Sequence, residues 1–194
     1  MKIDIEHLNA TFPKIPPTMQ AKGWTYGVWY TGKRYQKQIM YGTYPGNFLA
    51  RALALFPEAK DILHCPSGTL NGDTPGITVD LMREYPRAPQ VQACASSLPF
   101  RDNSFDLYLS DPPYSPEDSK IYGCPPYPIG KAMREASRVL RPNGYFGMLH
   151  VYYPSYRRSD WQLEGLIAVV TGFMSKTRMF SIFRNKKPPL FEKI

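Results

Sequence analysis

Residues 104–114 read Ser-Phe-Asp-Leu-Tyr-Leu-Ser-Asp-Pro-Pro-Tyr, a run of apolar and β-forming residues that stops at two prolines. The run predicts a buried strand from Phe105 to Ser110. Proline cannot continue a β-ladder, and each proline biases the preceding residue toward extended geometry. We therefore expect the strand to deliver its last side chains into open space at its carboxyl end. We call residues 111–114 the shelf.

The shelf combines hydrogen-bond acceptors with an aromatic ring. Asp111 supplies a carboxylate, Pro112 and Pro113 fix the positions of backbone carbonyls, and Tyr114 supplies the ring. This set suits a flat heterocycle with an exocyclic amino group, because a carboxylate and a carbonyl can accept the two amine hydrogens while the heterocycle stacks on the tyrosine. The alternative for four residues alone is a strand followed by a proline turn, with Tyr114 capping the core.

Asp-Pro-Pro-Tyr after a hydrophobic strand resembles the signature of the S-adenosylmethionine-dependent amino-methyltransferases, which methylate adenine N6 or cytosine N4. The resemblance runs from about Tyr44 to Lys187, with cofactor-binding segments before the Asp-Pro-Pro-Tyr segment, an order that this family uses. It implies a single Rossmann-like class I methyltransferase domain and S-adenosyl-L-methionine as the cofactor. It assigns catalytic roles to Asp111, Pro112, Pro113 and Tyr114.

The alternation of strand and helix patterns independently favours an α/β fold with a mostly parallel central sheet. Strands are expected at 61–64, 76–80, 90–93, 105–110 and 145–151, and helices at 47–56 and 129–140. A C-terminal antiparallel hairpin is expected from residues 163–171 and 177–184. Only a loop is expected between residues 68 and 77, because a parallel crossover with a helix needs about a dozen residues or more. Ligands of such sheets bind beyond the carboxyl ends of the strands.

The first expected strand leads into a turn that matches only part of the methyltransferase pattern. The family has an acidic residue followed by three alternating glycines under the methionine part of the cofactor. Here His64 replaces the acid and only Gly68 keeps its glycine, although Ser67-Gly68-Thr69 resembles the Ser-Gly-Thr of the amino-methyltransferases. Such a turn lets backbone N–H groups approach a ligand. The resemblance assigns cofactor binding to His64, Cys65, Pro66, Ser67 and Gly68.

Two further strand ends complete the expected cofactor site. Asp80 matches the acid that accepts the ribose hydroxyls, with Leu81 beside it; the alternative is a helix N-cap for residues 81–85. Cys94-Ala95-Ser96 resembles the segment whose first residue, usually Asp, meets the adenine amino group. A thiol is a poor acceptor, so the backbone of Ala95 and the side chain of Ser96 are expected to contact the adenine edge.

Upstream, Tyr44, Pro45 and Asn47 match a segment that closes over the cofactor carboxylate and the reacting site. The alternative is a helix start with Asn47 as the N-cap. Asp111 is counted with the cofactor-binding residues as well as the catalytic ones. Residues 115–127 are expected to form a mobile lid over the shelf.

The composition of the chain indicates which kinds of partner it binds. The chain has 194 residues, a net charge of +8 and a pI of 9.4, so an anionic partner is expected and nucleic acid leads that list. DNA is favoured over RNA, and adenine is the favoured base in DNA because Asp rather than Ser opens the motif. Residues 1–43 form an aromatic and basic arm, with no regular element expected over residues 1–42, which either binds nucleic acid or lies over the sheet. The basic residues expected to bind nucleic acid are Lys33, Arg34, Lys37, Arg157, Arg158, Arg184, Lys186 and Lys187. Residues 44–194 form the methyltransferase domain, and no linker separates the two, so one compact unit is expected.

Several classes of protein are disfavoured. The chain shows no secretory signal and no apolar run that could span a bilayer, so no membrane partner is expected. Cys65, Cys94 and Cys124 have neither paired nor metal-ligand spacing, which predicts free thiols, no metal and a cytoplasmic location. The oligomeric state is not indicated.

Three functions remain open. The first is methylation of an exocyclic amino group, with adenine N6 in DNA favoured; the base would have to leave its duplex to reach the shelf. The second is an RNA base methyltransferase. The third is a binding module that has kept the fold and lost the cofactor, motivated by His64, Pro66 and Cys94.

Overall fold

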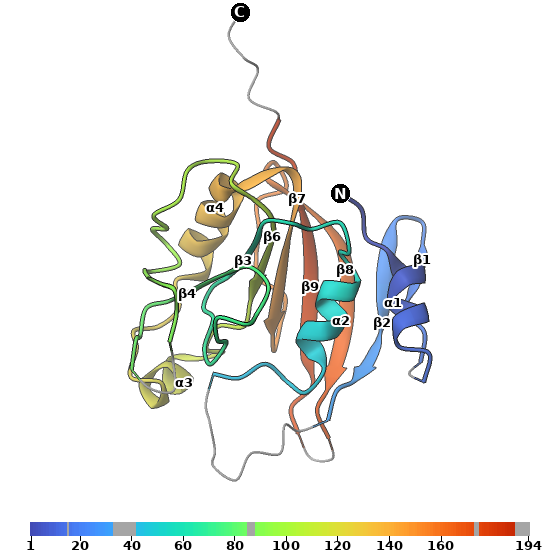
Figure 1. Cartoon of the computed structure of the whole chain (residues 1–194), viewed down its shortest axis with the longest axis horizontal. Helices are drawn as coiled ribbons and strands as arrows, with labels where there is room; N and C mark the ends of the chain where they lie inside the picture. Colours follow the sequence, from blue (N-terminus) through green and yellow to red (C-terminus); the bar gives the residue numbers. More distant parts are fainter. Residues whose placement is uncertain (15, 33–41, 85–87, 173–174, 189–194) are drawn as a thin grey trace, which may run out of the picture.

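The computed structural model describes residues 1–14, 16–32, 42–84, 88–172 and 175–188. These residues form a sheet of nine strands with helices on both faces (Figure 1). The helices are α1 (Ile5–Thr11), α2 (Phe48–Ala54), α3 (Pro116–Ile121) and α4 (Ile129–Val139). The strands are β1 (Met19–Ala21), β2 (Trp24–Tyr30), β3 (Ile62–His64), β4 (Ile77–Asp80), β5 (Val91–Gln92), β6 (Phe105–Ser110), β7 (Leu140–His150), β8 (Trp161–Val170) and β9 (Arg178–Asn185).

The strand order is β1-β2-β8-β9-β7-β6-β3-β4-β5. The pairs β2–β8, β7–β6, β6–β3, β3–β4 and β4–β5 are parallel. The last strand, β9, lies antiparallel between β7 and β8. This arrangement confirms the predicted mostly parallel α/β fold with a C-terminal antiparallel hairpin.

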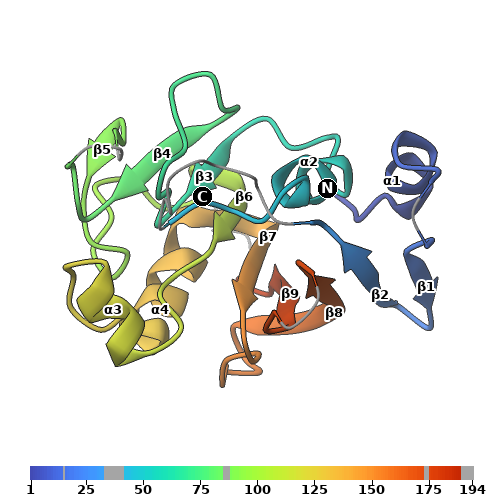
Figure 2. The same cartoon turned by 90° about the horizontal axis from the view of Figure 1, so that it is seen from below.

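The sheet separates two hydrophobic layers, and β6 contributes to both. Leu107 and Leu109 face the layer that contains α1 and α2, whereas Tyr108 faces the layer under α4. Figure 2 shows α1 and α2 on one side of the sheet and α3 and α4 on the other. Each buried large apolar side chain contributes about 1.5–3 kcal/mol. The alternation therefore fixes the register of the strand that leads to the shelf.

The expectation that residues 1–42 contain no regular element is wrong, because residues 5–30 form α1, β1 and β2. β2 extends the sheet by pairing in parallel with β8, from Thr25↔Gly165 to Tyr30↔Val170. Trp29 anchors it: the side chain is fully buried against Phe48 and Phe180, and its Nε1 donates to Thr18 Oγ1 at 2.9 Å. Trp29 thus links β2 to α2, while the backbone pairing with β8 makes the segment a strand.

The structure adds detail to two smaller expectations. The region expected as a lid contains α3, whose N-cap Ser115 accepts a hydrogen bond from the Asp118 N–H at 3.1 Å. Asn47 is the N-cap residue of α2, as expected, but it has the left-handed conformation with φ 58° and its side chain makes no capping hydrogen bond. The predicted loop between β3 and β4 is confirmed, since residues 65–76 contain no helix. No described helix is long and apolar enough to cross a membrane.

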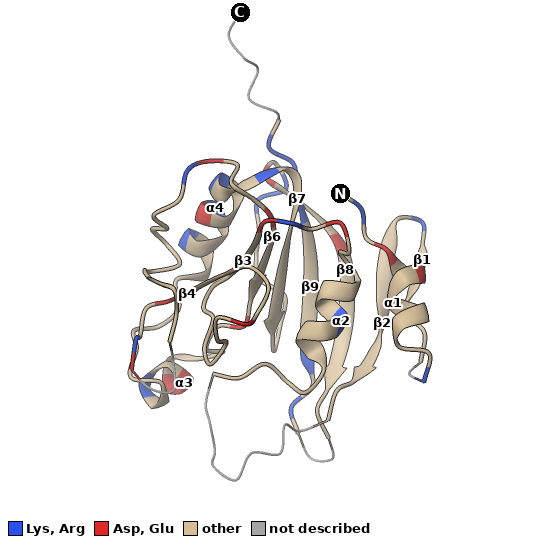
Figure 3. Ribbon diagram, in the orientation of Figure 1, with Lys and Arg blue, Asp and Glu red and all other residues tan. Residues whose placement is uncertain are grey.

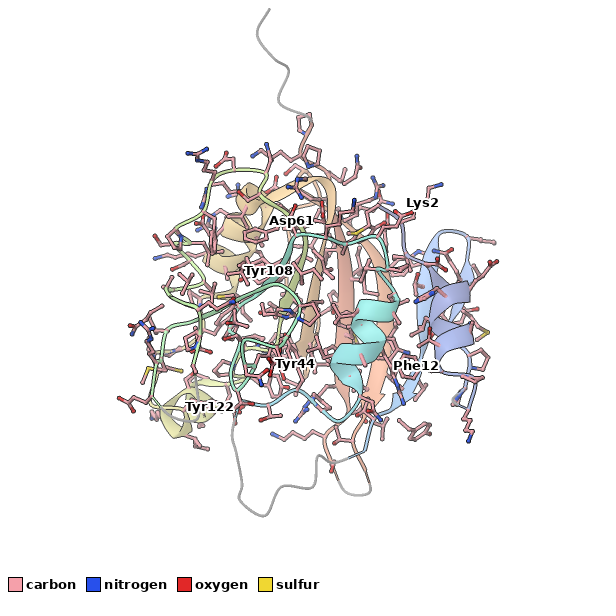
Figure 4. All side chains as sticks on the ribbon, in the orientation of Figure 1. Lys2, Phe12, Tyr44, Asp61, Tyr108 and Tyr122 are labelled. Atoms are coloured by element: carbon pink, nitrogen blue, oxygen red, sulfur yellow. The ribbon has the colours of Figure 1, made fainter. Side chains whose placement is uncertain are left out.

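The strands define two edges of the sheet. At the edge called the carboxyl edge here, β3, β4, β6 and β7 end and β9 begins; the opposite edge is called the amino edge. Figure 4 shows Tyr44 and Tyr122 below Asp61, which precedes β3. The shelf follows β6 and therefore lies at the carboxyl edge.

Candidate active site at the carboxyl edge

Asp111 leaves β6 with its carboxylate partly enclosed by protein. Its Oδ1 accepts a hydrogen bond from the Tyr114 hydroxyl at 2.6 Å. Burial raises the pKa of Asp111 to about 6, while Arg178 and the Tyr114 hydroxyl act in the opposite direction. The carboxylate is therefore an ionised acceptor at neutral pH and becomes protonated in mild acid.

The Tyr114 ring is enclosed rather than freely exposed. It packs edge-on against His150 with ring centroids 5.0 Å apart and an interplanar angle of 76°. The guanidinium carbon of Arg178 lies 5.4 Å from the Tyr114 ring centroid. Burial and the neighbouring carboxylate raise the pKa of Tyr114, so its hydroxyl remains a donor. A cation therefore covers one side of the ring on which the heterocycle was expected to stack.

The turn after β3 is built around Gly68. Its φ of 55° lies in the left-handed region, and a Cβ there would lie 1.7 Å from the Gly42 carbonyl oxygen. Thr69 N–H donates to the same oxygen at 2.9 Å, and the Thr43 and Thr69 hydroxyls are 2.8 Å apart. The turn therefore holds the segment before α2 at the carboxyl edge, next to the residues that the resemblance also places there.

Asp80 connects the turn to β4. Its Oδ2 accepts from Gly68 N–H at 2.8 Å, and its Oδ1 accepts from Met82 N–H at 3.0 Å. The N-cap alternative is not observed, since residues 81–84 form no helix. Each carboxylate oxygen has lone pairs beyond these bonds. Asp80 can thus hold the turn and still accept from a ligand hydroxyl.

The Cys94 segment is braced from α4. Cys94 Sγ lies 3.1 Å from Ser96 Oγ, and Leu98 N–H donates to Glu135 Oε1 at 2.7 Å. Arg138 pairs with Glu135 and donates to the Leu98 carbonyl at 3.0 Å. This ion pair on α4 fixes the path of residues 94–98 beside β5.

The segments described above line one pocket at the carboxyl edge. The volume of this pocket is about 690 Å³, including its open mouth. Its lining residues come from the turn after β3, the ends of β4 and β5, the shelf, and the stretch between α3 and α4: Gly42, Cys65, Pro66, Asp80, Leu81, Met82, Ala93, Cys94, Ala95, Asp111, Pro113, Tyr122, Cys124, Pro125, Pro126, Tyr127 and Pro128. Burial raises the pKa of the Cys65 thiol to about 12, so the thiol in this wall is neutral.

The pocket brings together some of the expected site residues and leaves others behind its walls. Cys65, Pro66, Asp80, Leu81, Cys94, Ala95, Asp111 and Pro113 line it. Tyr44, Pro45, Asn47, Ser67, Gly68, Ser96, Pro112 and Tyr114 are not among its lining residues. His64 is also outside the lining, because its Nε2 is bonded at 2.9 Å to the Pro75 carbonyl. The histidine in the acidic position therefore stabilises the loop to β4.

Several lining and neighbouring residues were not among the predicted site residues, although residues 115–127 were expected to lie over the shelf. Residues 122–128 form one wall, and the Tyr127 hydroxyl lies 3.3 Å from Ser110 Oγ at the end of β6. Cys124-Pro125-Pro126-Tyr127 repeats the Pro-Pro-Tyr of the shelf, which was the available signal. His150 and Arg178 were missed because they belong to β7 and β9, and only the sheet pairing brings them to the shelf.

Two buried hydroxyls test whether the pocket suits a polar cofactor. Tyr44 OH and Ser67 Oγ are buried and have no hydrogen-bond partner among the described residues. Tyr44 stacks on Phe48 with centroids 5.3 Å apart, and its pKa is raised by burial, followed by Asp111. Unsatisfied buried hydroxyls beside a pocket are groups that a ligand can satisfy.

In the described part of the chain, no three His, Cys, Asp or Glu residues gather where they could hold a metal.

No protein-family model matches the chain. The uncharacterized protein YafE of Escherichia coli (strain K12) is 33% identical over 78 residues, which are 40% of this chain and 33% of YafE. TrmN from Thermus thermophilus has a similar structure, with a TM-score of 0.54 and 16% identity over 76% of this chain and 51% of TrmN. The structure titled "Putative methyltransferase yhhF from Escherichia coli" has a TM-score of 0.50 and 13% identity over 82% of this chain and 98% of yhhF.

The chain therefore spans about a third of YafE and about half of TrmN. At these identities the likeness to solved structures shows the fold alone. The structural neighbours are Rossmann-like methyltransferases, and this chain has their fold.

Proposed function

We propose that the chain is an S-adenosylmethionine-dependent methyltransferase that acts on an exocyclic amino group of a nucleic acid base. One observation carries the proposal: Asp80, Cys94 and Asp111, from three different strand ends, line one pocket at the carboxyl edge. S-adenosylmethionine is the expected cofactor of a chain with this fold. When bound, it supplies an electrophilic methyl group.

The cofactor half of the pocket is assigned by chemistry. Asp80 would accept the ribose hydroxyls, and the Ala93–Ala95 backbone would border the adenine. The turn at Ser67 and Gly68, with Tyr44 behind it, would face the methionine end, where two buried hydroxyls lack partners among the described residues. The same segments contain four further residues of the expected cofactor site: Pro45, Asn47, Pro66 and Leu81. His64 holds the adjacent loop.

The shelf half is assigned to the substrate amine. An amine conjugated to its ring is a poor nucleophile until its lone pair is turned toward the electrophile. The Asp111 carboxylate and the Pro112 carbonyl, by accepting the two amine hydrogens, would favour that geometry and stabilise the growing positive charge. Tyr114 would contact the base, and Pro113 keeps the shelf rigid. Adenine N6 in DNA is favoured because Asp opens the motif; a base in RNA is the second candidate substrate.

Cofactor binding is the first test, and Asp80 is the residue to change. Isothermal titration calorimetry should show binding of S-adenosylmethionine to the wild type. Asp80→Ala should weaken binding about 30-fold, the size of a charge-assisted hydrogen bond of about 2 kcal/mol. Asp73→Ala, in the exposed loop before β4, is the matched control and should bind normally. If the wild type gives no heat of binding, the enzyme function is rejected and the remaining alternative is a binding module that has kept the fold and lost the cofactor.

Methyl transfer is the second test, with labelled cofactor and pools of single-stranded DNA and RNA. Asp111→Ala should reduce transfer at least 100-fold, as expected for loss of electrostatic stabilisation of the reacting group. Cofactor binding by the variant should stay close to normal. Full activity in a folded Asp111→Ala protein would end the proposed role of the shelf. Preference between the two pools decides between DNA and RNA.

A further inference from the structure

Three aromatic rings form a continuous series at the carboxyl edge, from the shelf to the surface. Tyr114 contacts His150 at 5.0 Å between centroids, and His150 contacts Tyr152 at 4.2 Å with an interplanar angle of 63°. His150 is 1% exposed, whereas Tyr152 is 52% exposed. The series therefore begins at the candidate reaction site and ends in an aromatic ring that is open to solvent.

Positive charge accompanies this series. β7 and β9 are neighbours in the sheet (Figure 2), and His150, the last residue of β7, pairs with Met179. Arg178 lies one residue before Met179, at the start of β9, and its guanidinium covers the Tyr114 ring. Lys176 precedes it and is exposed. A cation at the shelf and a second one close by in the chain favour an anionic ligand along the rings.

His150 adds an independent sign of a missing ligand. Its Nδ1 accepts a hydrogen bond from the Tyr152 N–H at 3.4 Å, which places the ring proton on Nε2. That Nε2 is buried and has no hydrogen-bond partner among the described residues. A buried donor of this kind is rare in folded proteins unless a ligand or water satisfies it. The ring that carries this donor contacts both tyrosines of the series.

We propose that Tyr152 is a stacking platform for the base next to the target base in a single strand of DNA, with Arg178 beside the phosphate that joins the two nucleotides. The proposal rests on the proposed function and adds a second nucleotide subsite to it. Aromatic side chains bind successive bases by stacking, and nearby cations contact the backbone. The ring series places this platform two ring contacts from the shelf residue Tyr114.

The test measures the affinity of a fluorescein-labelled single-stranded deoxyoligonucleotide for the cofactor-free protein. Tyr152→Ala should weaken binding about 10-fold, the loss expected for one stacked base. Tyr152→Phe should bind like the wild type, because stacking needs the ring and not the hydroxyl. Tyr152→Leu keeps an apolar contact with His150 and should still lose affinity. The matched control is Tyr26→Ala, on β2, where the ring is 41% exposed and two strands separate it from β7.

Three outcomes would contradict the proposal or part of it. Equal affinity of Tyr152→Ala, Tyr152→Leu and wild type, with unchanged melting temperatures, would overturn the platform. So would an equal loss in Tyr26→Ala. A ribo-oligonucleotide of the same sequence that binds tighter, with the same dependence on Tyr152, would overturn the assignment to DNA. Methyl transfer to a free nucleoside separates the two proposals: transfer that persists in Tyr152→Ala supports the enzyme even where the platform fails.

Discussion

At the residue scale, Asp111 and Tyr114 form one unit that titrates. The hydroxyl of Tyr114 stabilises the ionised carboxylate, while burial disfavours it, and the pKa of Asp111 settles at about 6. Only the ionised form can accept two hydrogen bonds without donating one. Methyl transfer should therefore rise as pH increases through about 6 and level off above it.

Tyr114→Phe tests this coupling. Removing the hydroxyl donor takes away a hydrogen bond that lowers the pKa of Asp111, so the acid limb of the pH profile should move to higher pH. A shift of about one unit is expected, the size of one hydrogen bond to a charged group. The rate above that limb should fall less than in Tyr114→Ala, which also loses the ring. Tyr153→Phe is the exposed control, and an unmoved midpoint in Tyr114→Phe would refute the coupling.

Single residues also mark the limit of inference from sequence. The acceptor Asp111 could be predicted because its strand stops at prolines, and the position of Asp80 could be predicted because it ends a strand. The orientation of the His64 side chain could not be predicted, because the Pro75 carbonyl that binds it belongs to a loop with no periodicity. Nor could the Arg178 contact with Tyr114, since it depends on pairing between strands far apart in sequence.

At the element scale, the turn after β3 is held by one glycine. Gly68→Ala should disrupt it, because the residue has a positive φ and a Cβ would overlap the Gly42 carbonyl. We expect a loss of stability of about 2–4 kcal/mol and a loss of cofactor binding, as for a strained backbone site. Gly72→Ala, where no atom lies within 4 Å of an added Cβ, should change neither. Chemical denaturation and calorimetry measure both variants, and equal behaviour would show that the turn tolerates a side chain.

Elements with clear periodicity were the predictable ones. β6 spans the predicted residues 105–110, and α4 ends one residue before the predicted end. The N-terminal elements were missed because the alternation of β2 was hidden by aromatic residues on both faces. Trp29 is buried, whereas Trp24 and Tyr30 on the other face are exposed. Hydrophobicity alone does not tell which of these rings finds a neighbouring strand.

At the scale of the whole molecule, the positive charge is unevenly placed. The basic residues expected to bind nucleic acid include Arg157, Arg158, Arg184, Lys186 and Lys187, together with Lys33, Arg34 and Lys37, which lie outside the described residues. Arg184 pairs with Glu164, Lys187 pairs with Asp102, and Lys186 donates to the Arg158 carbonyl at 2.9 Å. These contacts surround the end of β9 at the amino edge, where Figure 3 shows several blue segments. The pocket is at the opposite edge.

A salt series distinguishes the two edges. Affinity for single-stranded nucleic acid should fall steeply with salt, because binding releases counterions. Lys176→Ala, near the carboxyl edge, should reduce the slope of log affinity against log salt by about one phosphate contact. Lys186→Ala should leave the slope unchanged. A flat dependence for the wild type, or an effect of Lys186→Ala alone, would reject the carboxyl edge as the docking side.

The parallel pairing of β2 with β8 also determines when the protein can fold. Residues 24–30 must wait for residues 165–170 before they can join the sheet, so β2 leaves the ribosome long before its partner strand exists. Contacts between such distant residues slow folding, because a long loop must close before they form. We therefore expect the apolar side of β2 to stay uncovered during synthesis and to be prone to aggregation until the last hairpin emerges.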